Sequence, residues 1–221
     1  MPDNKYKLIS FVICPFVQRS IVVLNHKKQD YDIEYIDIEN PPEWYLKKVP
    51  TGKVPALFIG DDVIFESAII NEFIDETCGT RLMPEEPLQR AKERSWIAYS
   101  EQLIFDQYGM MTADNAESFN EKKAYFFQQL LKLETEVGKN YFNGENFSLI
   151  DASIAPIFTR LTMLPSLYDD FKEKLNIDSN LIGYIQSLSS SEDVSNSVTA
   201  DFEEHFLSYF NNHNSYCLKS F

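Results

Sequence analysis

The chain has 221 residues with 20 basic and 34 acidic side chains, which gives a formal net charge of −14. This charge opposes non-specific binding to nucleic acid or to an anionic membrane. No apolar run approaches the length of a membrane span and the N-terminus carries no secretory pattern, so we expect a cytoplasmic protein without membrane contact. Three widely spaced cysteines, Cys14, Cys78 and Cys217, argue against a disulfide framework.

The first part of the chain alternates strand and helix. An apolar, β-branched run predicts a strand over 7–13, and Pro15 begins a helix that continues to about residue 28. The next predicted elements are a strand over 31–38, a short helical piece over 44–48, a β-hairpin of 54–59 and 63–65, and a helix over 66–76. This order in fewer than 80 residues is typical of a thioredoxin-like domain.

A turn-rich stretch over 79–87 ends this pattern, and the chain is predicted to be helical after it. The predicted helices span 91–111, 121–137, 148–164, 181–188 and 200–210. We therefore predict a thioredoxin-like α/β domain over 1–80, a linker over 81–88 and an all-α domain over 89–221.

Cys14 lies where the first predicted strand runs into a helix. Because Pro15 suits the first helical turn, Cys14 falls at the N-cap, where unpaired backbone N–H groups and the helix dipole favour a thiolate. Thiols at helix N-termini have pKa values of roughly 3.5–7.5, against about 8.5 for a free cysteine. The sequence thus predicts a nucleophile with a lowered pKa. The alternative is a cysteine that only fills space in the core.

Several basic residues lie around the thiol and the loop that follows it in the sequence. Arg19, Lys47, Lys48 and Lys53 form a cationic group in an acidic chain, which favours an anionic small ligand near Cys14; the alternative is a set of ordinary solvated side chains.

Ser148 and Asp151 invite a catalytic interpretation, but no Gly-x-Ser-x-Gly motif surrounds them. Their spacing instead predicts a capping box with a structural role. The chain also lacks Cys-x-x-Cys and any His/Cys spacing suited to zinc, so we expect no metal.

Three ordered segments, 14–19, 52–57 and 66–70, together resemble the cytosolic glutathione transferase superfamily, specifically its cysteine-type, omega-like members. The resemblance covers essentially the whole chain and implies the glutathione transferase fold. The predicted capping box at Ser148 and Asp151 falls where that family has a buried one.

The resemblance also implies a glutathione site. Pro55 would be cis and would turn the backbone of Val54 toward the cysteinyl part of glutathione. Glu66 and Ser67 would receive the γ-glutamyl ammonium and carboxylate groups, and Lys53 the glycyl carboxylate. The full set of implied glutathione contacts is Phe16, Lys48, Lys53, Val54, Glu66 and Ser67.

One position departs from the family pattern. Omega-like relatives often have a lysine where this chain has Pro41, so either a nearby lysine compensates or glutathione binds more weakly. The pocket for the second substrate is expected to include Phe16, Tyr99 and Tyr108.

The implied activity is that of a glutathione-dependent thiol transferase or reductase with Cys14 as the nucleophile. Glutathione would be the co-substrate, and the second substrate a small electrophile or disulfide, with dehydroascorbate and glutathionyl ketones as further test substrates. The family also implies a homodimer, with Phe65, Phe73 and the helix starting near Ala91 as contributors.

Two alternatives share the fold. Residues 147–161 also resemble stringent starvation protein A, which implies a non-catalytic regulatory binding protein. Chloride-channel-like relatives carry a similar Cys-Pro-Phe motif, but the net charge and the lack of a membrane-seeking stretch weigh against them.

Overall fold

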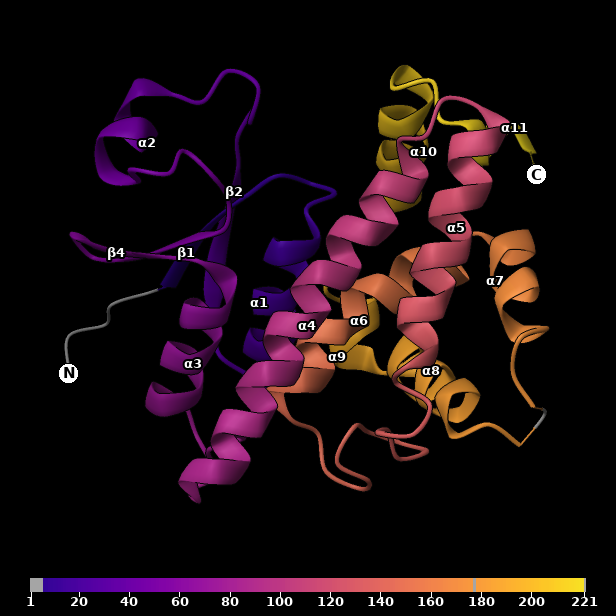
Figure 1. Ribbon diagram of the computed structural model, residues 1–221. Helices are drawn as coiled ribbons and strands as arrows, with labels where there is room; N and C mark the ends of the chain where they lie inside the picture. Colours follow the sequence, from indigo (N-terminus) through magenta and orange to yellow (C-terminus); the bar gives the residue numbers. More distant parts are fainter. Residues whose placement is uncertain (1–5, 177, 221) are drawn as a thin grey trace.

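The computed structural model describes residues 6–176 and 178–220, and its first part is built around a four-stranded mixed sheet (Figure 1). Its elements are β1 (Tyr6–Ser10), α1 (Pro15–His26), β2 (Tyr31–Tyr35), α2 (Glu43–Lys48), β3 (Ala56–Ile59), β4 (Asp62–Phe65) and α3 (Ser67–Thr77). The strand order is β2-β1-β3-β4, with β1 parallel to β2 and antiparallel to β3. The parallel pair is joined through α1, as a β-α-β unit requires.

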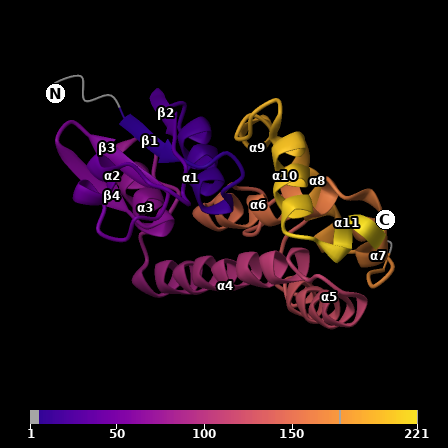
Figure 2. The same cartoon turned by 90° about the horizontal axis from the view of Figure 1, so that it is seen from above.

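The rest of the described chain is helical. Its elements are α4 (Pro87–Met111), α5 (Ala116–Leu131), α6 (Leu149–Thr162), α7 (Pro165–Lys172), α8 (Asn180–Ser190), α9 (Glu192–Ser195), α10 (Phe202–Asn212) and α11 (Tyr216–Ser220). Helix α6 packs against α1, α4 and α8, and so joins the two parts of the molecule. Figure 2 shows α4 and α5 lying beneath the sheet-containing part and the other helices. The predicted fold class is confirmed; the exact domain limits stay predictions.

Several predicted boundaries are wrong for identifiable reasons. The first strand ends at Ser10, because the Cys14 N–H donates to the Phe11 carbonyl at 2.9 Å and closes a turn. The helix predicted over 121–137 starts at Ala116, where the Asn115 side chain caps it by accepting from the Ser118 N–H. Helix α4 begins at Pro87, four residues before the predicted start. Helices α7, α9 and α11 were not predicted.

The predicted capping box at the start of α6 is confirmed. The Asp151 carboxylate accepts from the Ser148 N–H at 2.7 Å, the Ser148 hydroxyl at 2.8 Å, the Phe142 N–H at 2.8 Å and the Tyr184 hydroxyl at 2.7 Å. Burial raises the pKa of Asp151, and these hydrogen bonds oppose the rise. These hydrogen bonds have a structural role, because they connect the loop before α6 and helix α8 to one buried carboxylate.

Ion pairs of buried basic side chains also connect the elements. Arg19, with no exposed side-chain surface, donates to the Ser153 carbonyl at 3.0 Å, the Ser100 hydroxyl at 2.8 Å and Glu101 at 3.3 Å. The alternative that Arg19 is an ordinary solvated side chain is therefore wrong, and its charge acts on Cys14 from a buried position. The Lys27 ammonium, directly after α1, pairs with the Asp75 carboxylate of α3 at 2.6 Å.

In the part of the chain that the structure describes, no helix combines the length and the apolar composition that a membrane crossing needs.

Candidate functional site

Cys14 is the N-cap residue of α1, in extended backbone conformation directly before Pro15. Its side chain is partly exposed, and its Sγ lies 3.9 Å from the carbonyl oxygen of Val54, in the loop between α2 and β3. This distance brings the thiol next to the segment that the sequence assigned to glutathione. The predicted position of Cys14 at a strand–helix junction is confirmed.

The protonation of Cys14 differs from the sequence-based prediction. Burial raises the pKa of the Cys14 thiol above its ordinary value. The backbone N–H groups of Val17 and Phe16 and the charges of Arg160 and Arg19 lower the pKa, but by less than burial raises it. The predicted net lowering is therefore wrong. The helix terminus does supply its N–H groups, and the apolar surroundings outweigh them.

A polar cavity lies on one side of the thiol. It is lined by Phe16, Thr51, Lys53, Val54, Pro55, Glu66, Ser67, Glu101 and Phe105. The structure thus brings together five of the six predicted glutathione contacts. Thr51, Glu101 and Phe105 were missed, and for the last two no sequence signal existed, because only the packing of α4 in the fold brings them to this cavity.

The backbone shapes this polar cavity. The Val54–Pro55 peptide bond is cis, as the resemblance implied. Glu66 has a φ of 70°, a left-handed value that is uncommon outside glycine and tends to be found at functional sites. Directly after it, the buried Ser67 opens α3, so the free N–H groups of that helix start lie at the cavity.

The predicted lysines do not all reach this cavity. Lys48 is not among the lining residues, and its ammonium group donates to the Asp61 carbonyl at 3.4 Å. Lys47 pairs with Glu43 at 3.4 Å on the exposed surface of α2. Lys53 is the lysine that lines the cavity in the described structure. The lysines predicted to form one cationic group therefore do not gather at one place.

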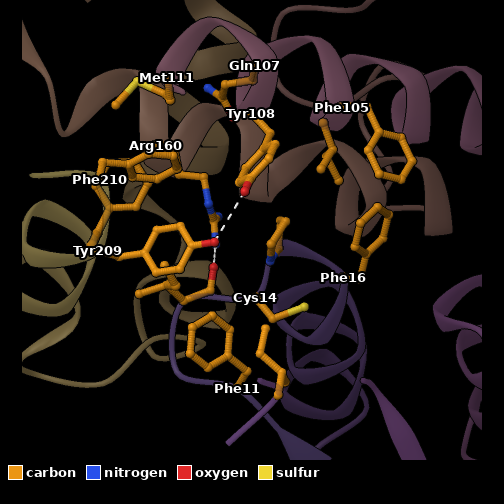
Figure 3. A pocket seen from close by; sticks show the side chains of 15 residues that line it. Phe11, Cys14, Phe16, Phe105, Gln107, Tyr108, Met111, Arg160, Tyr209 and Phe210 are labelled. Carbon is orange, nitrogen blue, oxygen red and sulfur yellow. Dashed lines mark hydrogen bonds between the residues drawn. The ribbon is translucent and has the colours of Figure 1, made fainter. Parts of the chain in front are cut away.

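An apolar cavity of about 260 Å³ lies on the other side of the thiol (Figure 3). It is lined by Phe11, Ile13, Cys14, Pro15, Phe16, Ile38, Ile104, Phe105, Gln107, Tyr108, Met111, Arg160, Phe206, Tyr209 and Phe210. The rings of Phe16 and Phe105, with centroids 5.5 Å apart, line both cavities and separate them. The hydroxyl groups of Tyr108 and Tyr209 lie 3.2 Å apart within hydrogen-bond distance.

Of the three residues predicted for a second-substrate pocket, Phe16 and Tyr108 line the apolar cavity. Tyr99 does not, because its hydroxyl donates to the Gln129 carbonyl at 3.0 Å between α4 and α5. The α10 aromatic residues were missed. Their helix was predicted, but its periodicity does not show which part of the molecule it covers.

Within residues 6–176 and 178–220, no group of three His, Cys, Asp or Glu side chains is arranged to hold a metal ion. The other two cysteines, Cys78 and Cys217, are buried and line neither cavity.

Comparisons with known proteins agree with this geometry. Residues 13–77 match the family model described as glutathione S-transferase, N-terminal domain. The chain is 32% identical over 169 residues to glutathione S-transferase omega-1 of Sus scrofa, which covers 74% of this chain and 70% of the relative. It is 27% identical over 180 residues to probable glutathione S-transferase DHAR1, cytosolic, of Oryza sativa subsp. japonica, covering 81% of each. Glutathione transferase Omega 3C from Trametes versicolor superimposes with a TM-score of 0.78 and 26% identity over 90% of each chain.

Proposed function

The chain belongs to the glutathione transferase superfamily and is omega-like, and from this premise we propose that it catalyses glutathione-dependent thiol transfer or reduction with Cys14 as the nucleophile. The observation that carries the proposal is the position of Cys14. Its sulfur lies beside Val54, between a polar cavity suited to a charged tripeptide and an apolar cavity suited to a second substrate.

Glutathione occupies the polar cavity in this proposal. Its γ-glutamyl carboxylate is held by Ser67 and the N–H groups at the start of α3, since helix N-termini favour anions. Glu66 faces the γ-glutamyl ammonium group and Lys53 the glycyl carboxylate. The cysteinyl part pairs with the backbone of Val54, which directs its sulfur toward Cys14.

The reaction has two thiol–disulfide exchange steps. The Cys14 thiolate attacks the glutathione sulfur of a mixed disulfide, forms Cys14–S–S–glutathione and releases the other thiol as a thiolate, which takes up a proton. The thiolate of a second glutathione then attacks the glutathione sulfur of this adduct, so that glutathione disulfide leaves and the Cys14 thiolate is restored. Together the two steps turn one mixed disulfide and one free glutathione thiol into the released thiol and glutathione disulfide.

The second step needs free glutathione because no second cysteine lies at the site in the described part of the structure. Cys78 and Cys217 are buried away from the cavities. This favours transfer from glutathione over exchange among protein disulfides. The relatives named above are glutathione enzymes, which favours an enzyme over the regulatory binding protein of the stringent starvation protein A type.

The family further suggests a cytoplasmic homodimer. The rice relative carries "cytosolic" in its name, and exposed apolar side chains lie on β4, α3 and the start of α4, namely Phe65, Ile69 and Leu88. Since both the sheet part and the helical part of the sequence are acidic, we expect association to rest on apolar contact and to strengthen modestly with salt. A monomer by sedimentation at micromolar concentration, at both low and moderate ionic strength, would contradict the dimer.

Replacement of Cys14 by serine tests the proposed function. Turnover of a small glutathione mixed disulfide should fall by about a thousandfold or more, because an alcohol is a far weaker nucleophile than a thiolate. The exposed Ser95→Ala, far from the thiol on α4, is the matched control and should keep full turnover. Unchanged turnover in Cys14→Ser would contradict the assignment.

A further inference from the structure

Arg160 is a buried charged side chain that favours the Cys14 thiolate and that the reaction above does not bring into contact with a substrate. It comes from α6, is only 5% exposed and lines the apolar cavity beside Cys14. Among the described residues that line this cavity, it is the only one with a charged side chain. Figure 3 shows its guanidinium end directed into the group of lining residues, toward the side where Cys14 lies.

The hydrogen bonds of Arg160 all go to neutral acceptors. Its Nη1 donates to the Gln18 side-chain oxygen at 2.6 Å and to the Pro156 carbonyl at 2.8 Å, and its Nη2 donates to the Ile13 carbonyl at 2.7 Å. A guanidinium has five N–H groups. For the Nε hydrogen and the second Nη2 hydrogen, no acceptor is found within residues 6–176 and 178–220.

The contrast with Arg19 shows what Arg160 lacks. Both are buried arginines near Cys14, but Arg19 is paired with the Glu101 carboxylate at 3.3 Å. No carboxylate in the described part of the chain forms an ion pair with Arg160. Burial lowers the pKa of Arg160 to about 10, so the guanidinium remains charged at neutral pH. The Phe202 ring, whose centroid lies 5.2 Å from the Arg160 Cζ, offsets part of the cost of burying this charge, and a bound anion would offset more of it.

We propose that the second substrate carries a carboxylate or a comparable anionic oxygen on an apolar, ring-containing body, and that Arg160 recognises that oxygen. This rests on the proposed function only in assigning the second substrate to the apolar cavity. The aromatic walls accept the apolar body, and the guanidinium supplies the fork of N–H groups that matches a carboxylate. The net charge of −14 repels anions, so a preference for a carboxylate has to arise locally.

A matched pair of non-reactive probes, 2-naphthoate and 2-naphthamide, tests this directly. They share an aromatic body and differ in charge. Titration calorimetry of the full chain at neutral pH should show 2-naphthoate binding about tenfold more tightly or better, as hydrogen bonds to charged groups allow. Equal binding, or a preference for the amide, would overturn the proposal without any variant being needed.

Variants then assign the preference to Arg160. Arg160→Met should bind the two probes equally, and Arg160→Lys should retain part of the preference because it keeps the charge but loses the fork. Arg94→Met is the matched control, since it removes the same charge from an exposed pair with Glu72 and should leave the preference intact. A folded Arg160→Met that retained the full preference would also overturn the proposal.

Arg160 contacts the Ile13 carbonyl and Gln18, so its loss could disturb the start of α1. Protection of Cys14 in the wild-type chain covers this case: 2-naphthoate should slow alkylation of Cys14 by iodoacetamide more than 2-naphthamide at equal concentration. Equal protection would count against the proposal. Because the probes do not react, these results are independent of turnover, and failure of the proposed function would appear instead as unchanged activity in Cys14→Ser.

Discussion

The two cavities that meet at Cys14 are built in opposite ways. The polar cavity is formed largely by a short continuous stretch, from Thr51 to Ser67, whose backbone is fixed by a cis peptide bond and by the left-handed Glu66. The apolar cavity is formed by side chains from the β1–α1 turn, α4, α6 and α10. A backbone-defined cavity suits one constant ligand, and a cavity of side chains can change its specificity by substitution. Under the proposed function, the molecule would separate a fixed co-substrate site from an adjustable substrate site.

Loss of the Ser67 hydroxyl should give the largest difference between the KM values of the two substrates. Ser67→Ala removes a hydrogen bond to a charged carboxylate, so KM for glutathione should rise about tenfold or more. KM for the second substrate should change little. Steady-state kinetics with each substrate varied in turn measures both values. An equal rise in the two KM values would show that the cavities are not independent.

The pH dependence of Cys14 alkylation measures how strongly its surroundings oppose ionisation. Since the thiolate is the reacting form and burial raises its pKa, the alkylation rate without glutathione should keep rising with pH beyond the ordinary thiol value of about 8.5. Iodoacetamide labelling across a pH series, followed by mass spectrometry of the Cys14 peptide, gives the profile. If the alkylation rate instead reached a plateau below about pH 7.5, the result would support the prediction that the helix N-terminus lowers the pKa of Cys14.

Tyr108→Ala should act on the apolar cavity alone. Tyr108 is 45% exposed and lines only that cavity, so its loss should raise KM for an aromatic second substrate several-fold and leave KM for glutathione unchanged. Tyr125→Ala is the matched control, because Tyr125 is 51% exposed on α5 and lines neither cavity. A larger effect on glutathione than on the second substrate would reverse the assignment of the cavities.

Glu93→Gln should leave both cavities unchanged and alter stability alone. Desolvation raises the pKa of Glu93 to about 7, from 4.5, although Asn143 donates to its carboxylate. Ionising Glu93 is therefore harder in the folded chain, and the resulting loss of stability begins above pH 4.5 and is complete above about pH 7. The variant should melt higher than the wild type at pH 8 and by a smaller margin at pH 5. A constant difference in melting temperature across this range would contradict the pKa shift.

The sequence predicted more of the polar cavity than of the apolar cavity. Val54, Glu66 and Ser67, the proposed glutathione contacts, lie close together in the sequence, so local motifs predicted most of the lining of the polar cavity. The prediction for Lys48 was wrong because residue spacing does not fix the direction of a long side chain. Its ammonium group donates to the Asp61 carbonyl instead.

The apolar cavity depends on how distant helices pack. The amphipathic pattern predicted α10, but only the fold brings Tyr209 to Tyr108. Arg19 and Arg160 lie five and 146 residues from Cys14 in the sequence, and their burial was equally hidden. The prediction for the pKa of Cys14 was wrong for a related reason: burial raises this pKa, and part of the apolar lining around the thiol comes from α4 and α10, far along the chain.

Mapping the glutathione adduct tests the central claim most directly. The wild-type chain is incubated with glutathione disulfide, digested without reductant and analysed by mass spectrometry. We predict one glutathione per chain, on the peptide that contains Cys14, with Cys78 and Cys217 unmodified as internal controls, and complete removal by added glutathione. An adduct confined to Cys78 or Cys217, or no adduct in a chain that still turns over the substrate, would contradict Cys14 as the nucleophile.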